Sequence, residues 1–290
     1  RYNLGGLGTY TSALAVGGYV PAAVANTESW NGSNWTEVND LNQASGALRG
    51  IGADNTSGIA VRGSYNESWN GSSWTEVNDL NTARDNLGGS GIITAGLVFG
   101  GLTPPATRDT KTESWNGSAW TEVNDLNSGR RQLGGSGTQT SSLAYGGESA
   151  PTADLALTES WDGTSWTEVA DLSTARNLIA SAGADNLSAL ASGGTQAPGV
   201  TGATEEWNGS TPVGAWSTQT SVNTARSDVE GAGSSAEAAL IFGGQVPGTG
   251  VVANTESWDG STWTEVNDMN TARNGFAGNG TQTSALGYGQ

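Results

Sequence analysis

The sequence predicts an all-β protein, a single β-propeller of four-stranded antiparallel blades that spans residues 1–290. The first observation behind this prediction is a repeated unit, whose clearest copy is ESWNGSSWTEVNDLNTAR at Glu67–Arg84. The second is that all 12 Trp fall in pairs within the copies of this unit. The third is a composition rich in Gly, Asn, Ser and Thr, which favour turns and strand edges over helix interiors.

The Trp pairs set the period of the repeat. They are Trp30 and Trp35, Trp69 and Trp74, Trp115 and Trp120, Trp161 and Trp166, Trp207 and Trp216, and Trp258 and Trp263. The spacing between successive pairs lies in the range of propeller blades. Because every Trp occupies a repeat position, we interpret these residues as part of the repeated core and not as a unique site.

Each repeat is expected to contribute four short strands. The first follows an Arg, as in Asn86–Gly89, and the second ends in Gly-Gly, as in Leu97–Gly101. The third strand ends at the first Trp of a pair, and the fourth begins at the second Trp. The Asn-Gly-Ser-Ser segment between them is typical of a tight hairpin turn, so the two indoles should face each other across the hairpin.

A fixed spacing follows the second Trp of each pair, as in Trp74, Val77, Leu80 and Arg84. With the strand ending in Gly-Gly, this spacing resembles the kelch repeat, and the resemblance covers nearly the whole chain. It implies a ring of four-stranded blades with the first strand of each blade innermost. The chain departs from that pattern at Ser45, which stands where an Arg is expected, and at Gly63, which lacks a second Gly.

The number of blades is open at the level of sequence. Six complete repeats are followed by the inner half of a seventh, and the predicted blades span about residues 1–42, 43–81, 82–127, 128–173, 174–223 and 224–270, with a partial blade at 271–290. We favour seven blades, the outer half of the last being supplied by residues beyond this sequence. The alternative is six blades with an extra hairpin.

Charge and composition exclude several classes of function. The net charge of −17 argues against nucleic acid as a partner, because phosphate binding requires clustered Lys and Arg. An anionic membrane surface would repel the chain, and no apolar run is long enough to insert in a membrane. Neither His nor Cys is present, which excludes His-dependent triads, zinc sites of the usual kind and a copper site like that of galactose oxidase.

The remaining ionisable residues mostly repeat, whereas an active site occurs once. Arg1, Arg84, Arg130, Arg176, Arg226 and Arg273 share one repeat position, where we expect them to pair with carboxylates between blades. Asp40, Asp79, Asp125, Asp171 and Asp268 share another, where we expect them to accept hydrogen bonds from nearby backbone N–H groups. No acidic pair stands out as unique. The sequence therefore predicts no enzyme, no cofactor and no metal site.

One segment varies freely between repeats, namely the connection from Gly-Gly to the next Glu-Ser-Trp. Variable loops on a rigid ring suit recognition, although neutral drift of tolerant loops would produce the same variation. Residues 102–112 add a local basic spot to an acidic protein. The candidate binding residues on this loop face are Tyr19, Pro21, Tyr65, Pro104, Pro105, Arg108, Lys111, Pro151, Pro198 and Pro247.

These observations predict a non-catalytic recognition or structural module, located extracellularly or on a virion surface. The Trp-Asn-Gly-Ser repeats resemble those in predicted structural proteins of marine bacteriophages, which implies a tail-associated or receptor-binding protein. Its expected partners are other structural proteins, a cell-surface receptor or a glycan. The alternatives are a secreted or cell-surface lectin-like adhesin and, more remotely, a carboxylate-dependent enzyme that acts on carbohydrates.

Overall fold

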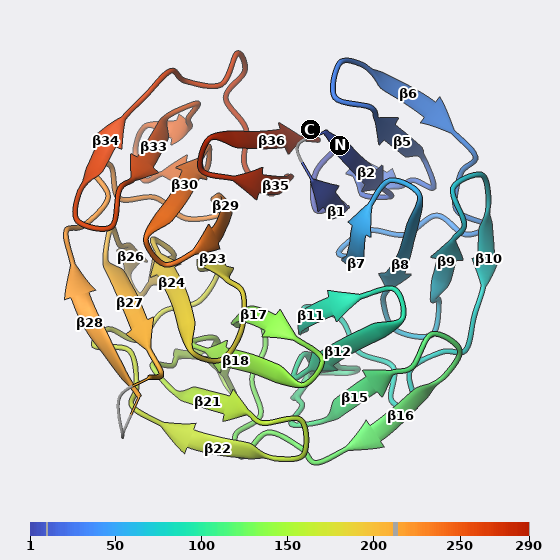
Figure 1. Ribbon diagram of the computed structural model, residues 1–290, viewed down its shortest axis with the longest axis horizontal. Helices are drawn as coiled ribbons and strands as arrows, with labels where there is room; N and C mark the ends of the chain where they lie inside the picture. The colour runs from blue at the N-terminus through green and yellow to red at the C-terminus, as the bar shows by residue number, and fades with distance from the viewer. Residues whose placement is uncertain (10, 211–213, 290) are drawn as a thin grey trace.

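The computed structural model describes residues 1–9, 11–210 and 214–289, and these form a ring of antiparallel β-sheets around a central hole (Figure 1). Six of the sheets have four strands each, and we number these blades 1 to 6 in chain order. The first strands of successive blades contact one another, so they line the hole, and the fourth strands lie at the rim. The prediction of an all-β propeller with four-stranded blades is confirmed.

The strands of each blade run from the centre outwards in chain order. Blades 1 to 3 comprise β1 (Gly5–Thr9), β2 (Ser12–Val16), β5 (Thr27–Trp30) and β6 (Trp35–Val38); β7 (Arg49–Asp54), β8 (Ser57–Val61), β9 (Glu67–Trp69) and β10 (Trp74–Glu76); and β11 (Gly88–Ile92), β12 (Ala95–Phe99), β15 (Thr112–Trp115) and β16 (Trp120–Val123). Blades 4 to 6 comprise β17 (Gly134–Thr138), β18 (Ser141–Tyr145), β21 (Thr158–Trp161) and β22 (Trp166–Val169); β23 (Ala180–Gly183), β24 (Ser188–Ser192), β27 (Thr204–Asn208) and β28 (Ala215–Gln219); and β29 (Glu230–Ser235), β30 (Ala238–Phe242), β33 (Thr255–Trp258) and β34 (Trp263–Glu265).

The remaining strands form two-stranded hairpins. Five of these hairpins connect the second and third strands of a blade: β3 (Tyr19–Val20) with β4 (Ala22–Ala23), β13 (Leu102–Thr103) with β14 (Thr107–Arg108), β19 (Glu148–Ser149) with β20 (Ala153–Asp154), β25 (Thr195–Gln196) with β26 (Gly199–Val200), and β31 (Gln245–Val246) with β32 (Gly250–Val251). The last hairpin, β35 (Ala277–Thr281) with β36 (Ser284–Tyr288), follows blade 6.

Six four-stranded blades with an extra hairpin was the alternative reading of the sequence, and the favoured seven blades are not supported. Strand β35 contacts β29 on one side and β1 on the other, so the β35–β36 hairpin closes the inner ring of strands (Figure 1). In the sequence, seven first-strand units alternate with only six Trp hairpins. The seventh unit accordingly forms the β35–β36 hairpin and not a four-stranded blade.

The inner strands begin later than the sequence predicts. Strand β11 starts at Gly88 and not at Asn86, because Asn86 has a left-handed backbone conformation with a φ of 52°. The same conformation occurs at the equivalent position of the other repeats, including Ala47 and Leu178. A side chain in this region is unfavourable by about 1–2 kcal/mol, so the surrounding ring must hold these residues in place.

The Trp pairs form the core between neighbouring blades. Trp115 and Trp120 face each other across the β15–β16 turn with ring centroids 5.2 Å apart, as predicted. Both indoles pack on Ile51 and Ile59 of blade 2, so each Trp hairpin covers the face of the preceding blade. Burial of such aromatic and aliphatic surface stabilises the ring by about 25 cal/mol per Å² of apolar area.

Buried ion pairs accompany this core. Arg130 and Glu159 lie 2.7 Å apart, and equivalent pairs join Arg84 to Glu113, Arg176 to Glu205 and Arg226 to Glu256. The predicted pairing with carboxylates is correct for these four Arg residues and for Arg1, which pairs with Glu28, but Arg273 has no carboxylate partner among the described residues. Each pair lies within one blade and not between blades. The link between blades is made by an Asn, as where Asn127 of blade 3 donates both its backbone N–H and its side-chain amide to Glu159 of blade 4.

The repeated Asp residues act as predicted. Asp125 accepts a hydrogen bond of 3.1 Å from the backbone N–H of Thr112, the first residue of β15. The equivalent bonds join Asp40 to Thr27, Asp79 to Asn66, Asp171 to Thr158 and Asp268 to Thr255. Each Asp therefore fixes the turn after the fourth strand against the start of the third.

Glycine allows the inner strands to approach closely at the centre of the ring. A Cβ added to Gly50 of β7 would lie 2.3 Å from the carbonyl oxygen of Gly6 in β1, and one added to Gly135 would lie 2.9 Å from the ring of Phe99. Neither contact is sterically possible without movement of the backbone or the ring. The Gly-rich inner strands are therefore required by the packing of neighbouring blades.

Candidate functional site

The most variable part of the repeat forms a common face of the ring. The five connecting hairpins each pair, through an isolated bridge, with the residue that precedes an inner strand, as in Arg131 with Glu148 and Asp85 with Leu102. The hairpins consequently stand beside the mouth of the central channel. Blade 2 lacks a hairpin and has the short turn around Tyr65 instead. We call this the hairpin face.

Neighbouring hairpins are joined by polar contacts. Arg108 of blade 3 donates to the carboxylate of Glu148 and, at 3.1 Å, to the carbonyl of Pro151, both in blade 4. Asp154 of blade 4 accepts from the backbone N–H of Ala197 at 2.7 Å and from Asn177 at 2.6 Å, both in blade 5. The hairpins of blades 3, 4 and 5 therefore form one continuous surface.

The structure places most of the predicted binding residues on exposed parts of this surface. Tyr65 is 49% exposed, whereas Tyr19 is partly buried and stacks on Tyr2 with ring centroids 5.6 Å apart. The proline residues named from the sequence all lie exposed at the hairpins: Pro21, Pro104, Pro105, Pro151, Pro198 and Pro247. The prolines and Tyr65 are distributed over the six blades around the ring.

The basic spot predicted at residues 102–112 is neutralised. Arg108 pairs with Glu148, and the Lys111 ammonium lies 2.8 Å from the carboxylate of Glu122 on β16. Glu122 also raises the pKa of Lys111 through this hydrogen bond. Both cations are therefore paired with carboxylates of the protein itself, and neither is free to bind an anionic ligand.

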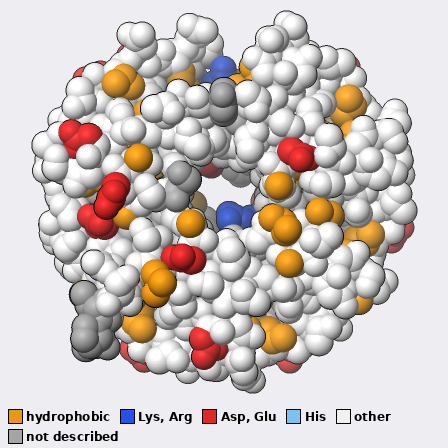
Figure 2. All heavy atoms as spheres, viewed as in Figure 1, with side chains coloured by type: hydrophobic (Ala, Val, Ile, Leu, Met, Phe, Trp, Pro, Cys, Tyr) orange, Lys and Arg blue, Asp and Glu red, His pale blue; other side chains and the backbone are white. Residues whose placement is uncertain are grey.

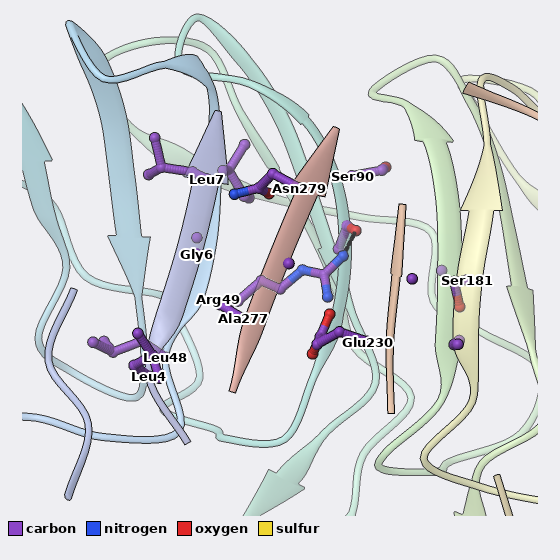
Figure 3. Close-up of a pocket in the computed structure, with 18 of the residues that line it drawn as sticks. Leu4, Gly6, Leu7, Leu48, Arg49, Ser90, Ser181, Glu230, Ala277 and Asn279 are labelled. Carbon is purple, nitrogen blue, oxygen red and sulfur yellow. Dashed lines mark hydrogen bonds between the residues drawn. The ribbon is translucent and has the colours of Figure 1, made fainter. Parts of the chain in front are cut away.

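The central channel holds a site that the sequence analysis did not identify. A cavity of about 370 Å³ is lined mainly by Gly residues of the inner strands, together with Arg49 of β7 and Glu230 of β29. Figure 2 shows the open hole and a basic side chain at its wall, and Figure 3 shows Arg49 and Glu230 projecting into the same cavity. Ser90, Ser181 and Asn279 complete its polar lining.

Burial dominates the electrostatics of this pair. It raises the pKa of Glu230 to about 8, although the positive charge of Arg49 acts in the opposite direction. Burial also lowers the pKa of Arg49, whose guanidinium donates to the carbonyl of Gly89 at 2.5 Å and whose Nε is buried without a hydrogen-bond partner. Glu230 therefore keeps its proton to a higher pH than an ordinary carboxyl, and in that form it can donate a hydrogen bond.

A second cavity, of about 340 Å³, forms the mouth of the channel on the hairpin face. An apolar collar surrounds it, made of one residue from each repeat: Leu4, Leu48, Leu87, Leu133, Ile179, Val229 and Phe276. Asp228 lies at this mouth, and burial raises its pKa.

A comparison of the repeats would have revealed the channel residues. The position after the collar residue is Gly or Ala in five repeats, at Gly5, Gly88, Gly134, Ala180 and Ala277, and it is charged only at Arg49 and Glu230. The two residues were not predicted from the sequence because they form a pair of opposite charge and not a unique acidic pair. The signal was the departure from Gly, the residue that the inner strands otherwise require.

Among the described residues, no group of three or more acidic side chains is arranged to hold a metal ion. No family model matches the chain, and no curated protein matches it. The fold and the site therefore rest on the geometry described above.

Proposed function

We propose that this chain is a non-catalytic recognition or structural module displayed on a surface, and that it belongs to a phage virion as a tail-associated or receptor-binding protein. The observation that carries the proposal is the hairpin face. Five hairpins of different sequence stand on one side of a ring whose Trp hairpins are nearly constant. A rigid ring that presents variable segments is typical of recognition proteins, because the ring provides stability and the segments determine which partner binds.

The contacts between hairpins support this proposal. The bonds from Arg108 to Glu148 and from Ala197 to Asp154 hold adjacent hairpins in fixed relative positions. A surface ordered before binding loses less conformational entropy when a partner docks. The partner we propose is another structural protein, a cell-surface receptor or a glycan. We also propose that the repeat is of the kelch type, on the spacing of Trp, apolar residue and Arg.

A lectin-like adhesin, secreted or attached to a cell surface, is the second candidate, and one observation favours it. Tyr2, stacked on Tyr19, is 40% exposed and Tyr65 is 49% exposed, and all three belong to the hairpin face. Exposed aromatic rings offer the apolar surface on which sugar rings pack. No described helix is long and apolar enough to cross a membrane.

Antibody-labelled electron microscopy of the native source material tests the proposed location. Label on phage tails or capsids is the expected result, and label confined to cells or to the soluble fraction would favour the adhesin. Binding of the labelled protein to host cells then tests the face. Tyr65→Ser should reduce binding, whereas Thr75→Ala, on the exposed rim strand β10, should leave it unchanged; equal binding by both variants would contradict a role for Tyr65.

A further inference from the structure

The sector of the ring between blade 6 and blade 1 differs from the other sectors. It contains only the β35–β36 hairpin, which sits where the inner two strands of a blade sit (Figure 1). Gln282 in its turn donates to the carbonyl of Trp258, just as Gln139 in the equivalent turn of blade 4 donates to Trp115. In the complete blades the second strand pairs with a third strand, but among the described strands β36 pairs only with β35. The outer edge of β36 is therefore an unpaired strand edge.

Complete interfaces show what the missing strands contribute elsewhere. The second Trp of a blade donates its indole N–H to the Thr that starts the third strand of the preceding blade, as in Trp166 to Thr112 at 2.9 Å. The Glu of the incoming hairpin accepts from the Asn that ends the preceding blade, as in Asn127 to Glu159 at 2.7 Å. The same Glu pairs with a buried Arg, here Arg130.

The corresponding groups beside the β35–β36 hairpin lack these partners. Arg273 occupies the position of Arg130 and donates only to the carbonyls of Gly289 and Thr271, with no carboxylate partner among the described residues. Thr255 occupies the position of Thr112, but within the described part of the chain no indole donates to it, and its hydroxyl makes only a long bond of 3.5 Å to the carbonyl of Ala253. Asn270 occupies the position of Asn127 and is exposed.

The apolar face of blade 6 is open at the same place. Val266 is 41% exposed and Met269 is partly buried, whereas the residues equivalent to Met269 in the other blades are only 3–5% exposed. Those residues are Leu41, Leu80, Leu126, Leu172 and Val222. A cavity of about 410 Å³ lies here, lined by Leu240, Phe242, Thr255, Val266, Met269 and Gln282 among others. It corresponds to the space that an indole pair fills between complete blades.

The other wall of the sector is equally incomplete. The Glu28 side chain of blade 1 is 44% exposed and pairs only with Arg1, whereas the equivalent Glu113 and Glu159 are at most 2% exposed. The rings of Trp35 and Tyr288 pack with centroids 4.8 Å apart, as those of Trp166 and Phe99 do, but no Thr hydroxyl of the residues that the structure describes accepts from Trp35. Blades 6 and 1 thus present complementary halves of one interface.

We propose that this sector is a docking site for a β-hairpin with the repeat's own chemistry, Thr-Glu-Ser-Trp, a tight turn and Trp-Thr-Glu-Val, supplied by polypeptide other than residues 1–290. Its first strand pairs with β36 so that Trp lies opposite Ala285 and Thr opposite Tyr288, as Trp258 and Thr255 lie opposite Ala239 and Phe242 in blade 6. Its Glu pairs with Arg273 and accepts from Asn270, and its second Trp donates to Thr255. The proposal is independent of what the hairpin face binds.

A synthetic peptide with the sequence of residues 112–127, TESWNGSAWTEVNDLN, is the probe. Isolated hairpins are marginally stable, so we expect weak one-to-one binding that is best followed by NMR titration up to millimolar concentrations. Binding should slow hydrogen exchange at residues 284–288. Arg273→Gln in the protein, or Gln in place of the peptide's first Glu, which corresponds to Glu113, should weaken binding about tenfold or more, because each change removes the buried charge pair. Tyr65→Ser, on the hairpin face, is the matched control and should bind normally.

Fusion of the same segment to Arg1 through a flexible Gly/Ser linker raises its effective concentration and provides a second measurement. The fused protein should have a higher Tm than the chain alone. The fusion in which Gln replaces the first Glu of the segment, which corresponds to Glu113, should lose most of that gain in Tm. No gain in Tm, or equal binding to the Arg273→Gln variant, would overturn the proposal. A concentration-dependent dimer that protects residues 284–288 would overturn it as well, because a second copy would then be the occupant.

Discussion

The buried Arg–Glu pairs provide the most direct test of how the blades are stabilised. Glu159 accepts hydrogen bonds from Arg130 at 2.7 Å and from both nitrogens of Asn127 at 2.7 and 2.8 Å, and the Arg130 side chain is fully buried. Glu159→Gln retains the volume but leaves the guanidinium in the interior without a counter-charge. Loss of one partner of a buried pair is destabilising by about 3–5 kcal/mol. For a domain of this size, even the lower figure lowers Tm by roughly 6–12 °C.

Glu28→Gln is the matched control, because Glu28 occupies the same repeat position in blade 1. Its side chain is 44% exposed and pairs only with Arg1, so its replacement should be destabilising by about 1 kcal/mol at most. Thermal unfolding followed by circular dichroism measures both variants at neutral pH. An equal fall in Tm for Glu159→Gln and Glu28→Gln would refute the reasoning, because burial would then make no difference to the pair.

Three further predictions follow from the core and the channel. Burial raises the folded-state pKa of Glu230 to about 8 from its ordinary value of 4.5, so between these pH values the folded protein retains a proton that the unfolded chain releases. The Tm of the native protein should therefore fall relative to that of Glu230→Gln as the pH rises from about 4.5 to 8. A constant difference in Tm across this range would contradict the prediction. Trp166→Phe should be more destabilising than Trp120→Phe by about 1 kcal/mol in denaturant titrations, because Trp166 donates to Thr112 whereas the buried N–H of Trp120 has no acceptor among the described residues. An equal fall in the free energy of unfolding for both variants would show that the bond to Thr112 contributes nothing. Gly50→Ala should be destabilising by about 1–3 kcal/mol, because the added Cβ would overlap the Gly6 carbonyl. Gly199→Ala should be neutral, because a Cβ at Gly199 meets nothing within 4 Å, and the Tm values of the two variants test this difference.

The local features of the repeat could be predicted from the sequence because each depends on residues close together in the chain. The Asn-Gly turn places Trp115 opposite Trp120 within one hairpin, and Asp125 reaches the backbone of Thr112 in the same blade. The seven first-strand units, five of which are followed by a second strand ending in Gly-Gly, likewise depend on local strand and turn chemistry. For the same reason the four-stranded blade was predictable, and so was the ring that its repetition implies.

The placement of the Arg residues could be predicted only in part. A carboxylate partner for Arg130 was expected from composition, but whether Glu159 lies in its own blade or in a neighbour depends on how the sheets stack. The role of Asn127 as the link between blades has no sequence signature of its own. It arises because the end of one blade meets the third strand of the next, which is a tertiary relationship.

The sequence by itself determined the blade, the Trp hairpins and the excess of inner-strand units over Trp hairpins, because these are set by short-range spacing and turn residues. Only the tertiary structure decided that the ring closes on the β35–β36 hairpin with six full blades, since closure depends on β35 contacting both β29 and β1. It also decided that Arg49 and Glu230 line the same cavity, although they are far apart in the chain. Their positions converge because the first strand of every blade lines the same channel.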